Sequence, residues 1–94
     1  MGMVFGWDSR KAKNNHAKHG VSFEEATTVF GDIPSLTIVD PRHIRPREER
    51  FVTIGNSYLG RLLVIVHCDD GDDIRIISAW KATRRERNDY EKGA

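Results

Sequence analysis

The chain of 94 residues has little cysteine and no long hydrophobic run. Its one cysteine, Cys68, excludes an internal disulfide, and within an apolar stretch it is expected to be a small buried side chain in a reducing compartment. No run approaches the roughly 20 apolar residues that a membrane-spanning helix needs, and the N-terminal sequence MGMVFGWDSR lacks the apolar core of a signal peptide. We therefore expect a cytoplasmic protein with no membrane partner.

The sequence also lacks an excess of charge and the motifs of the common enzyme classes. Fifteen Lys and Arg against 14 Asp and Glu give a formal net charge of +1, so the protein is not a polycation that coats nucleic acid. The patterns GxxxxGK[ST], GxGxxG and GxSxG do not occur. His16 and His19 are spaced for a shared metal, but no third ligand has motif spacing. We expect no metal and no cofactor, with any chemistry supplied by Arg, Lys, His and Glu.

Helix caps and turn residues divide the chain, residues 1–94, into the elements of a single domain. The expected elements are a strand at 4–7, a helix from Asp8 or Ser9 to Gly20, a helix from Ser22 (capping box with Glu25) to near Gly31, strands at 36–40, 50–58, 61–69 and 74–80, a loop at 41–49, and a helix from Thr83. The order β-α-α-β-β-β-β-α predicts an α+β fold, with two N-terminal helices packed on a mostly antiparallel sheet and a short C-terminal helix.

Two neighbouring strands carry candidate site residues. Side-chain alternation allows His67 and Arg75, on strands joined by the turn DDGDD, to be cross-strand neighbours on one face. A cation beside a histidine disfavours its protonation, which suits a general base. Alternatively, His67 fills a half-buried strand position. Arg50, which follows Glu49, either projects onto the same rim or is a salt-bridged surface residue.

The C-terminal stretch IRIISAWKATRRER places cations where a helix disfavours them. With Thr83 as N-cap, Arg84 and Arg85 lie in the first helical turn, where the helix dipole disfavours each cation by about 0.3–1 kcal/mol. Together with Lys81 they predict an anion site for phosphate, or else they pair with nearby acidic residues. Trp80 either stacks a nucleic-acid base or packs at the rim of the core.

Three segments match a known pattern: WDSRKAKNNHAKHGVSFEEA, ERFVTIG and RIISAWKATRRER. Together they cover most of the chain, which resembles the BrnT family of type II toxins, related in fold to RelE-type endoribonucleases. The resemblance implies a RelE-like fold and a toxin that cleaves RNA and halts translation. It also implies a cognate BrnA-like antitoxin with a ribbon-helix-helix part, which inactivates the toxin and brings the complex to operator DNA.

RNA cleavage without a metal needs a base for the 2′-hydroxyl and positive charge around the phosphorus. We expect His67 or Glu49 as the base. The cations expected to stabilise charge or bind RNA phosphate are Arg50, Arg75, Lys81, Arg84 and Arg85, beside Trp80.

The family pattern commonly has Arg where this chain has Trp80. An alternative function is therefore that of a catalytically weakened homologue that acts mainly as an antitoxin-binding co-repressor. A third hypothesis, direct DNA binding by the C-terminal helix, has less support because the charges of this helix alternate in sign.

Overall fold

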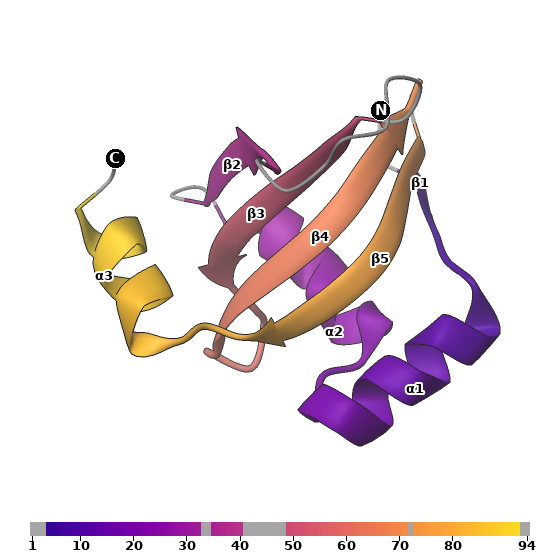
Figure 1. The fold of residues 1–94 in the computed structure, drawn as a ribbon, viewed down its shortest axis with the longest axis horizontal. Helices are drawn as coiled ribbons and strands as arrows, with labels where there is room; N and C mark the ends of the chain where they lie inside the picture. The colour runs from indigo at the N-terminus through magenta and orange to yellow at the C-terminus, as the bar shows by residue number, and fades with distance from the viewer. Residues whose placement is uncertain (1–3, 33–34, 41–48, 72, 93–94) are drawn as a thin grey trace.

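A computed structural model describes residues 4–32, 35–40, 49–71 and 73–92. The elements in chain order are β1 (Val4–Gly6), α1 (Ser9–His19), α2 (Phe23–Thr27), the 3₁₀ turn η1 (Thr28–Gly31), β2 (Leu36–Val39), β3 (Arg50–Asn56), β4 (Leu62–Asp70), β5 (Asp73–Lys81) and α3 (Arg84–Glu91). The strands form one five-stranded sheet in the order β1-β5-β4-β3-β2, with β1 parallel to β5 and the other pairs antiparallel (Figure 1). The predicted α+β fold and element order are confirmed; the predicted loop 41–49 lies outside the described residues except for Glu49.

Local sequence signals set the ends of the helices. The Asp8 carboxylate caps α1 by accepting hydrogen bonds from two backbone N–H groups of the first turn. Gly20 ends α1 with φ of 70°, a left-handed conformation that glycine adopts without the steric penalty of a Cβ. Thr83 and Glu86 form a complete capping box at the start of α3. These caps explain why the sequence places both helices close to their observed bounds.

The predicted capping box at the start of α2 is only half formed. The Ser22 hydroxyl accepts a hydrogen bond from the Glu25 N–H (3.0 Å), but the Glu25 side chain turns into the protein. There its carboxylate accepts a hydrogen bond from the Ser57 hydroxyl (2.7 Å) and pairs with the Arg61 guanidinium. The bond from Arg61 holds the pKa of Glu25 below its usual value. Glu25 therefore fastens α2 to the turn between β3 and β4 instead of capping its own helix.

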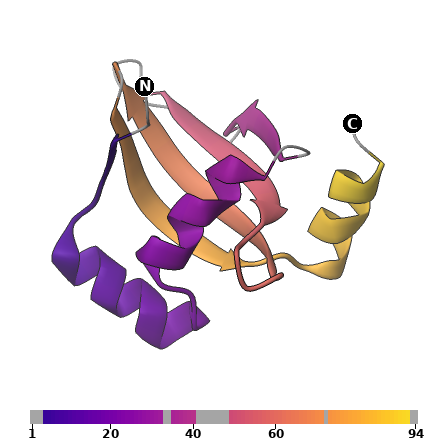
Figure 2. The ribbon, with the colours of Figure 1, turned by 180° about the vertical axis from the view of Figure 1, so that it is seen from behind.

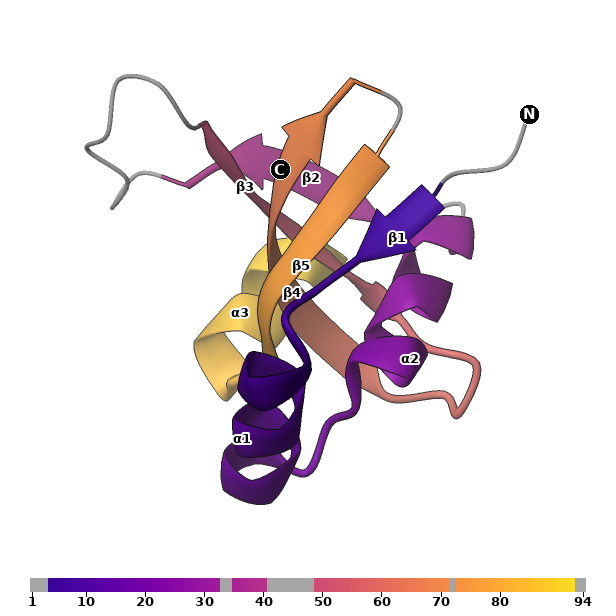
Figure 3. The ribbon, with the colours of Figure 1, turned by 90° about the vertical axis from the view of Figure 1, so that its right-hand side faces the viewer.

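The hydrophobic core lies between the sheet and α2. Figures 1 and 2 show α2 covering one face of the sheet, with α1 lying across the lower end. In Figure 3, α2 lies on one side of β4 and β5 and α3 on the other. The buried core residues are Val21, Phe23, Ala26, Val29, Leu63, Ile65, Ile76 and Ala79. The upper part of the face away from α2 is left uncovered by any helix of the described residues (Figure 3).

A buried amide attaches α1 to the sheet. The Asn15 side chain accepts a hydrogen bond from the Ala79 N–H (3.1 Å) and donates to the carbonyl oxygens of Ala79 (2.9 Å) and Val21 (3.0 Å). Asn15 is 7% exposed, so water does not compete for these groups. The amide satisfies both backbone groups of one β5 residue and fixes α1 against that strand.

The ladder between β4 and β5 changes register partway along. Near the turn, His67 pairs with Ile76 and Cys68 pairs with Arg75, and the pairing shifts by one residue between Val66 and His67. Because directly paired residues share a face of the sheet, Arg75 shares its face with Cys68 and not with His67. The prediction that His67 and Arg75 are cross-strand neighbours on one face is therefore wrong. Turn and bulge geometry set this register, and side-chain alternation alone does not reveal it.

Candidate active site

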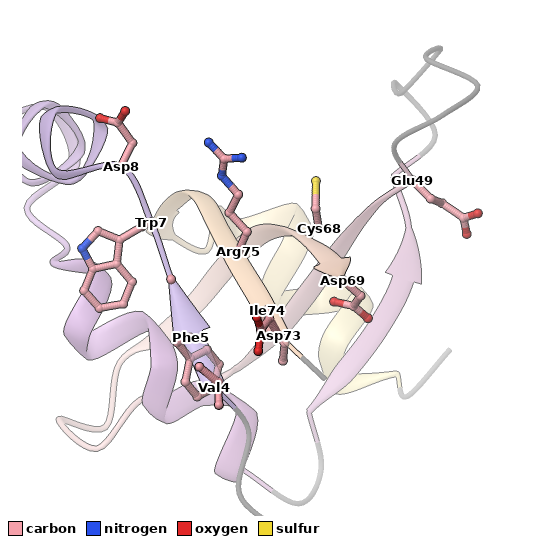
Figure 4. Close-up of a pocket in the computed structure, with 11 residues that line it drawn as sticks. Val4, Phe5, Trp7, Asp8, Glu49, Cys68, Asp69, Asp73, Ile74 and Arg75 are labelled. Carbon is pink, nitrogen blue, oxygen red and sulfur yellow. The ribbon is translucent and has the colours of Figure 1, made fainter. Parts of the chain in front are cut away.

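A cleft of about 530 Å³ opens at the end of the sheet formed by β1, β4 and β5. Figure 4 shows the side chains of Arg75 and Cys68 rising on the same side of the sheet, with Asp8 beside them. The residues that line the cleft are Val4, Phe5, Gly6, Trp7, Asp8, Glu49, Cys68, Asp69, Asp73, Ile74 and Arg75. The cleft joins an apolar floor from β1 and β5 to a charged rim.

Arg75 is the one basic residue among the described residues that line the cleft. Its side chain is exposed, and its positive charge helps to lower the pKa of Asp8, although the N–H bond from Lys11 is the larger cause. A guanidinium in this setting presents several N–H donors in a fixed planar fork, which matches the oxygens of a phosphate. The cleft therefore holds an anion-binding group surrounded by carboxylates.

Arg50 and Arg75 project from the same face of the sheet. Cys68 lies between them in the ladder, since Arg50 pairs with Cys68 and Cys68 pairs with Arg75. Glu49, next to Arg50, also lines the cleft. The structure thus places Glu49 and Arg75 at the cleft and Arg50 on the same face of the sheet as Arg75.

His67, the fourth residue expected to be catalytic, is buried on the opposite face beneath α2 and η1. The residue is 2% exposed; its Nε2 lies 2.8 Å from the Thr53 hydroxyl and its Nδ1 lies 3.0 Å from Asp69 Oδ1. The Phe30 ring packs edge-on against it and the Phe51 ring stacks on it, with ring centroids 4.9 and 5.8 Å away. Burial lowers the pKa of His67, with the hydrogen bond to Asp69 opposing the shift. Because both ring nitrogens are engaged, His67 does not contact a ligand directly.

Sequence reasoning missed Asp69 and Thr53. Asp69 lies two residues after His67, so alternation puts both on one face, and this spacing was a usable signal. Thr53 contacts His67 across the β3–β4 ladder, and its hydroxyl lies 2.6 Å from that of Thr37 on β2. A threonine on a strand has no feature that marks such a contact, because β-branched residues are common there.

The predicted phosphate-binding residues lie at the other end of β5. A rise of about 3.3 Å per residue puts Lys81 roughly 20 Å from Arg75 along the strand. Lys81, Arg84 and Arg85 are exposed. Glu86 already occupies the start of α3, since its carboxylate accepts hydrogen bonds from the Thr83 N–H (2.8 Å) and the Trp80 indole N–H (3.2 Å). This carboxylate places negative charge where an anion site was expected.

Trp80 is half-buried at the junction of three elements. Besides its hydrogen bond to Glu86, its ring lies 6.2 Å from the His19 ring at the end of α1. The indole thereby connects the end of β5 to α1 and α3. Trp80 was expected either to stack a nucleic-acid base or to pack at the rim of the core, and these contacts are those of a residue packed at the rim.

A metal centre needs clustered ligand side chains and a membrane span needs a long apolar helix, and the described residues bear on both. No group of three or more His, Cys, Asp or Glu side chains in this part of the chain is arranged to hold a metal ion. None of its helices is both long enough and apolar enough to cross a membrane.

Comparison with known protein families identifies the class of protein to which the chain belongs. A family model described as the ribonuclease toxin BrnT of type II toxin-antitoxin systems matches residues 7–86. The α+β chain is thus a ribonuclease toxin of a type II toxin-antitoxin system. The chain belongs to the BrnT family, and the resemblance seen in its motifs is confirmed.

A solved structure supports the same fold. The crystal structure of the Brucella abortus ribonuclease toxin BrnT superposes with a TM-score of 0.63 at 22% sequence identity. The match covers 88% of this chain and 100% of that chain, so the two share the fold over most of their length. No curated protein matches the chain significantly.

Proposed function

We propose that this protein is an endoribonuclease that cleaves RNA without a metal ion, inhibits translation, and is neutralised by a BrnA-like ribbon-helix-helix antitoxin. Membership of a family of ribonuclease toxins supports the activity and the existence of an antitoxin. The observation that supports a location for the active site is the exposed Arg75 guanidinium in the cleft, with Arg50 on the same face of the sheet. The complex with the antitoxin, and not the toxin alone, is expected to bind operator DNA.

The reaction requires the 2′-oxygen to bond to phosphorus while the bond to the 5′-oxygen breaks. A base takes the proton from the 2′-hydroxyl, the leaving 5′-oxygen gains a proton, and negative charge accumulates on the phosphorane. In the proposed reaction Arg75, with Arg50 on the same face of the sheet, stabilises that charge, and Glu49 is a carboxylate that lines the cleft with Arg75. His67 is excluded from direct contact with RNA by its burial, so any role it has is indirect.

The exposed cations at the far end of β5 fit a role in holding the RNA strand. Lys81 lies roughly 20 Å from Arg75 along β5, a span of about three nucleotides of extended single strand, and Arg84 and Arg85 begin the helix that follows. In this arrangement the RNA passes around the end of β5, since the register pairs Lys81 with Leu63 and Arg75 with Cys68 on opposite faces, and the phosphate to be cut lies at Arg75. These cations contribute affinity that salt weakens, whereas Arg75 contributes to the chemical step.

A second candidate function is an antitoxin-binding co-repressor with little nuclease activity. Trp80 supports it, because this position commonly carries Arg in the family and the indole N–H is engaged with Glu86. The variant Trp80→Arg separates the two candidates. If the wild-type protein binds antitoxin without cutting RNA and Trp80→Arg restores cleavage, the co-repressor function is the right one.

The deciding experiment expresses the protein with and without its antitoxin and follows growth, translation and RNA integrity. Expression alone is expected to stop growth and fragment RNA, and co-expression of the antitoxin to prevent both. The purified protein should cleave RNA equally well in EDTA. Normal growth with intact RNA would overturn the nuclease proposal, and loss of cleavage in EDTA would overturn its metal independence.

A further inference from the structure

β2 is an edge strand whose outer side is unpaired in the part of the chain that the structure describes. It ends the sheet order β1-β5-β4-β3-β2, and β3 is its one neighbour among the described strands (Figure 1). Its sequence, LTIV, contains no charged residue and no proline, and its ladder with β3 keeps one register from end to end. Charges, prolines and bulges are the features by which proteins keep an edge strand from pairing with another chain. β2 therefore lacks the usual protection of an edge.

Two aliphatic side chains of β2 are also exposed to solvent. Ile38 is 50% exposed and Val39 is 54% exposed. They project from opposite faces of the sheet, because side chains alternate along a strand. A partner seated on one face would cover one of them, whereas a chain that runs alongside β2 covers both. The exposure of this pair therefore favours an extended segment beside the strand over a ligand on either face.

The alternation of hydrogen bonds identifies the backbone groups of β2 that face outward. The Asp40 N–H, just after the strand, donates to the carbonyl oxygen of the directly opposite Arg50 (2.8 Å). In an antiparallel ladder such bonded pairs alternate with pairs that exchange no bond. Thr37 and Val39 lie in pairs of the second kind, so their N–H and C=O groups point to the free edge. Donors and acceptors at this spacing are matched by the backbone of another extended peptide.

The free edge leads to the face on which the active site is proposed. Asp40, at the end of β2, is bonded to Arg50, and Arg50 shares its face of the sheet with Arg75. With strands about 4.8 Å apart, a strand added outside β2 lies about 19 Å from β5, a distance that about six extended residues span. A chain that pairs with β2 can therefore continue across the face that carries both arginines.

The antitoxin is the partner that fits this edge. Membership of a type II toxin family implies such a protein. Two copies of this chain paired through β2 would align only four residues of each, whereas a stable interface uses roughly 20–30 residues from each partner. A separate chain can extend beyond the strand on both sides and reach that size.

We propose that the antitoxin adds a β-strand to β2 through the backbone groups of Thr37 and Val39, and that its adjoining residues cover Arg50 and Arg75. The inference rests on the proposed neutralisation by an antitoxin and names the surface that this neutralisation uses. It does not depend on RNA cleavage.

The first test removes one outward donor. Val39→Pro deletes an N–H that β3 does not use, and edge strands accept proline at such positions. Val39→Thr, the matched control, keeps the N–H and the β-branched shape. In calorimetric titrations with the purified antitoxin, Val39→Pro is expected to raise Kd about 10-fold and Val39→Thr less than about 3-fold. Thermal unfolding establishes that both variants fold. Equal affinity of two folded variants for the antitoxin overturns the inference.

The second test follows amide hydrogen exchange by NMR in the wild-type protein. In the free toxin the Thr37 and Val39 amides are expected to exchange faster than those of Leu36 and Ile38, and antitoxin binding should slow them about 10-fold or more. Unchanged exchange at Thr37 and Val39 in the complex overturns the inference, as does protection that appears only at β1. Protection in the free toxin that rises with its concentration would assign the edge to a second copy instead.

The same experiments separate this inference from the proposed function. An antitoxin that does not bind the toxin overturns the proposed neutralisation and this inference together. Binding with the expected protection, by a toxin that leaves RNA intact, supports the inference and overturns the nuclease activity alone.

Discussion

His67 and Arg75 lie on opposite faces of the sheet, although their strands are hydrogen-bonded neighbours and each pairs one position away from the other. The imidazole points toward α2 and the core, and the guanidinium points into the cleft beside Cys68. This separation divides their roles. Arg75 is available to a phosphate, whereas His67 is buried and hydrogen-bonded to Asp69 on its own face.

Replacing Arg75 should remove charge stabilisation without disturbing the fold. Because each preorganised donor is worth on the order of 3 kcal/mol in the transition state, Arg75→Ala should lower kcat for RNA cleavage about 100-fold. The exposed side chain predicts a thermal unfolding midpoint close to wild type. Arg87→Ala, an exposed arginine on α3, is the control and should remain fully toxic. Undiminished toxicity of both Arg75→Ala and Arg50→Ala would rule out this site.

Protonation of His67 should destabilise the protein in mild acid. Burial holds the folded-state pKa of His67 below the usual histidine value of about 6.5, so below about pH 6.5 the unfolded chain binds the proton more readily than the folded one. The contribution of neutral His67 to the free energy of unfolding is therefore fully present above this pH, and it is lost as the pH drops toward the folded-state pKa. Urea titrations from about pH 7.5 to 5.5 measure this slope.

Two glutamine variants test whether His67 is the histidine that causes the loss of unfolding free energy in mild acid. His67→Gln should flatten the decline of unfolding free energy, since the ionising group is gone. His16→Gln, at an exposed position on α1, should keep it. A wild-type unfolding free energy that stays constant over this pH range would contradict the assignment of a depressed pKa to His67.

Local signals made the elements predictable, whereas the site depended on long-range geometry. Asp8, Gly20 and Thr83 each act within a few residues of their helix end, and the structure has the helices where these caps place them. The register shift between β4 and β5 has no such local mark. It shows only in the core, where Ile76 and Ala79 are both buried although uniform alternation would put them on opposite faces.

The same reason explains which candidate site residues the sequence could suggest. Arg50 and Arg75 have the chemistry of phosphate ligands, so residue type was enough to select them, and the sheet places them on one face. Asp69 was passed over as part of an acidic turn. Its contact with His67 follows from their two-residue spacing on β4, whereas its place among the residues that line the cleft depends on where β1 and β5 end, which no short stretch of sequence records.

Charging the buried amide at position 15 should release α1 from the sheet. In Asn15→Asp a carboxylate oxygen would replace the N–H donors that face the carbonyl oxygens of Val21 and Ala79. Buried acceptors left facing one another predict a loss of about 3 kcal/mol in unfolding free energy. Asn14→Asp adds the same charge at the exposed neighbouring position and should change stability by less than about 0.5 kcal/mol. Chemical denaturation of both variants measures the difference, and equal stabilities would mean that the amide bonds are dispensable.

Gly55 permits a close approach between β3 and the segment that follows α2. A Cβ at this position would lie 2.8 Å from Ser35 Cβ and 3.0 Å from Val29 Cγ1, and β3 would have to move away from η1. Gly55→Ala should therefore lower the free energy of unfolding by about 1–3 kcal/mol. At Gly31 a Cβ meets nothing within 4 Å, so Gly31→Ala controls for the reduced freedom of the unfolded chain and should be neutral or slightly stabilising. Thermal unfolding of the two variants gives the comparison. If Gly55→Ala matches Gly31→Ala, the contact between β3 and η1 is looser in solution than the structure has it.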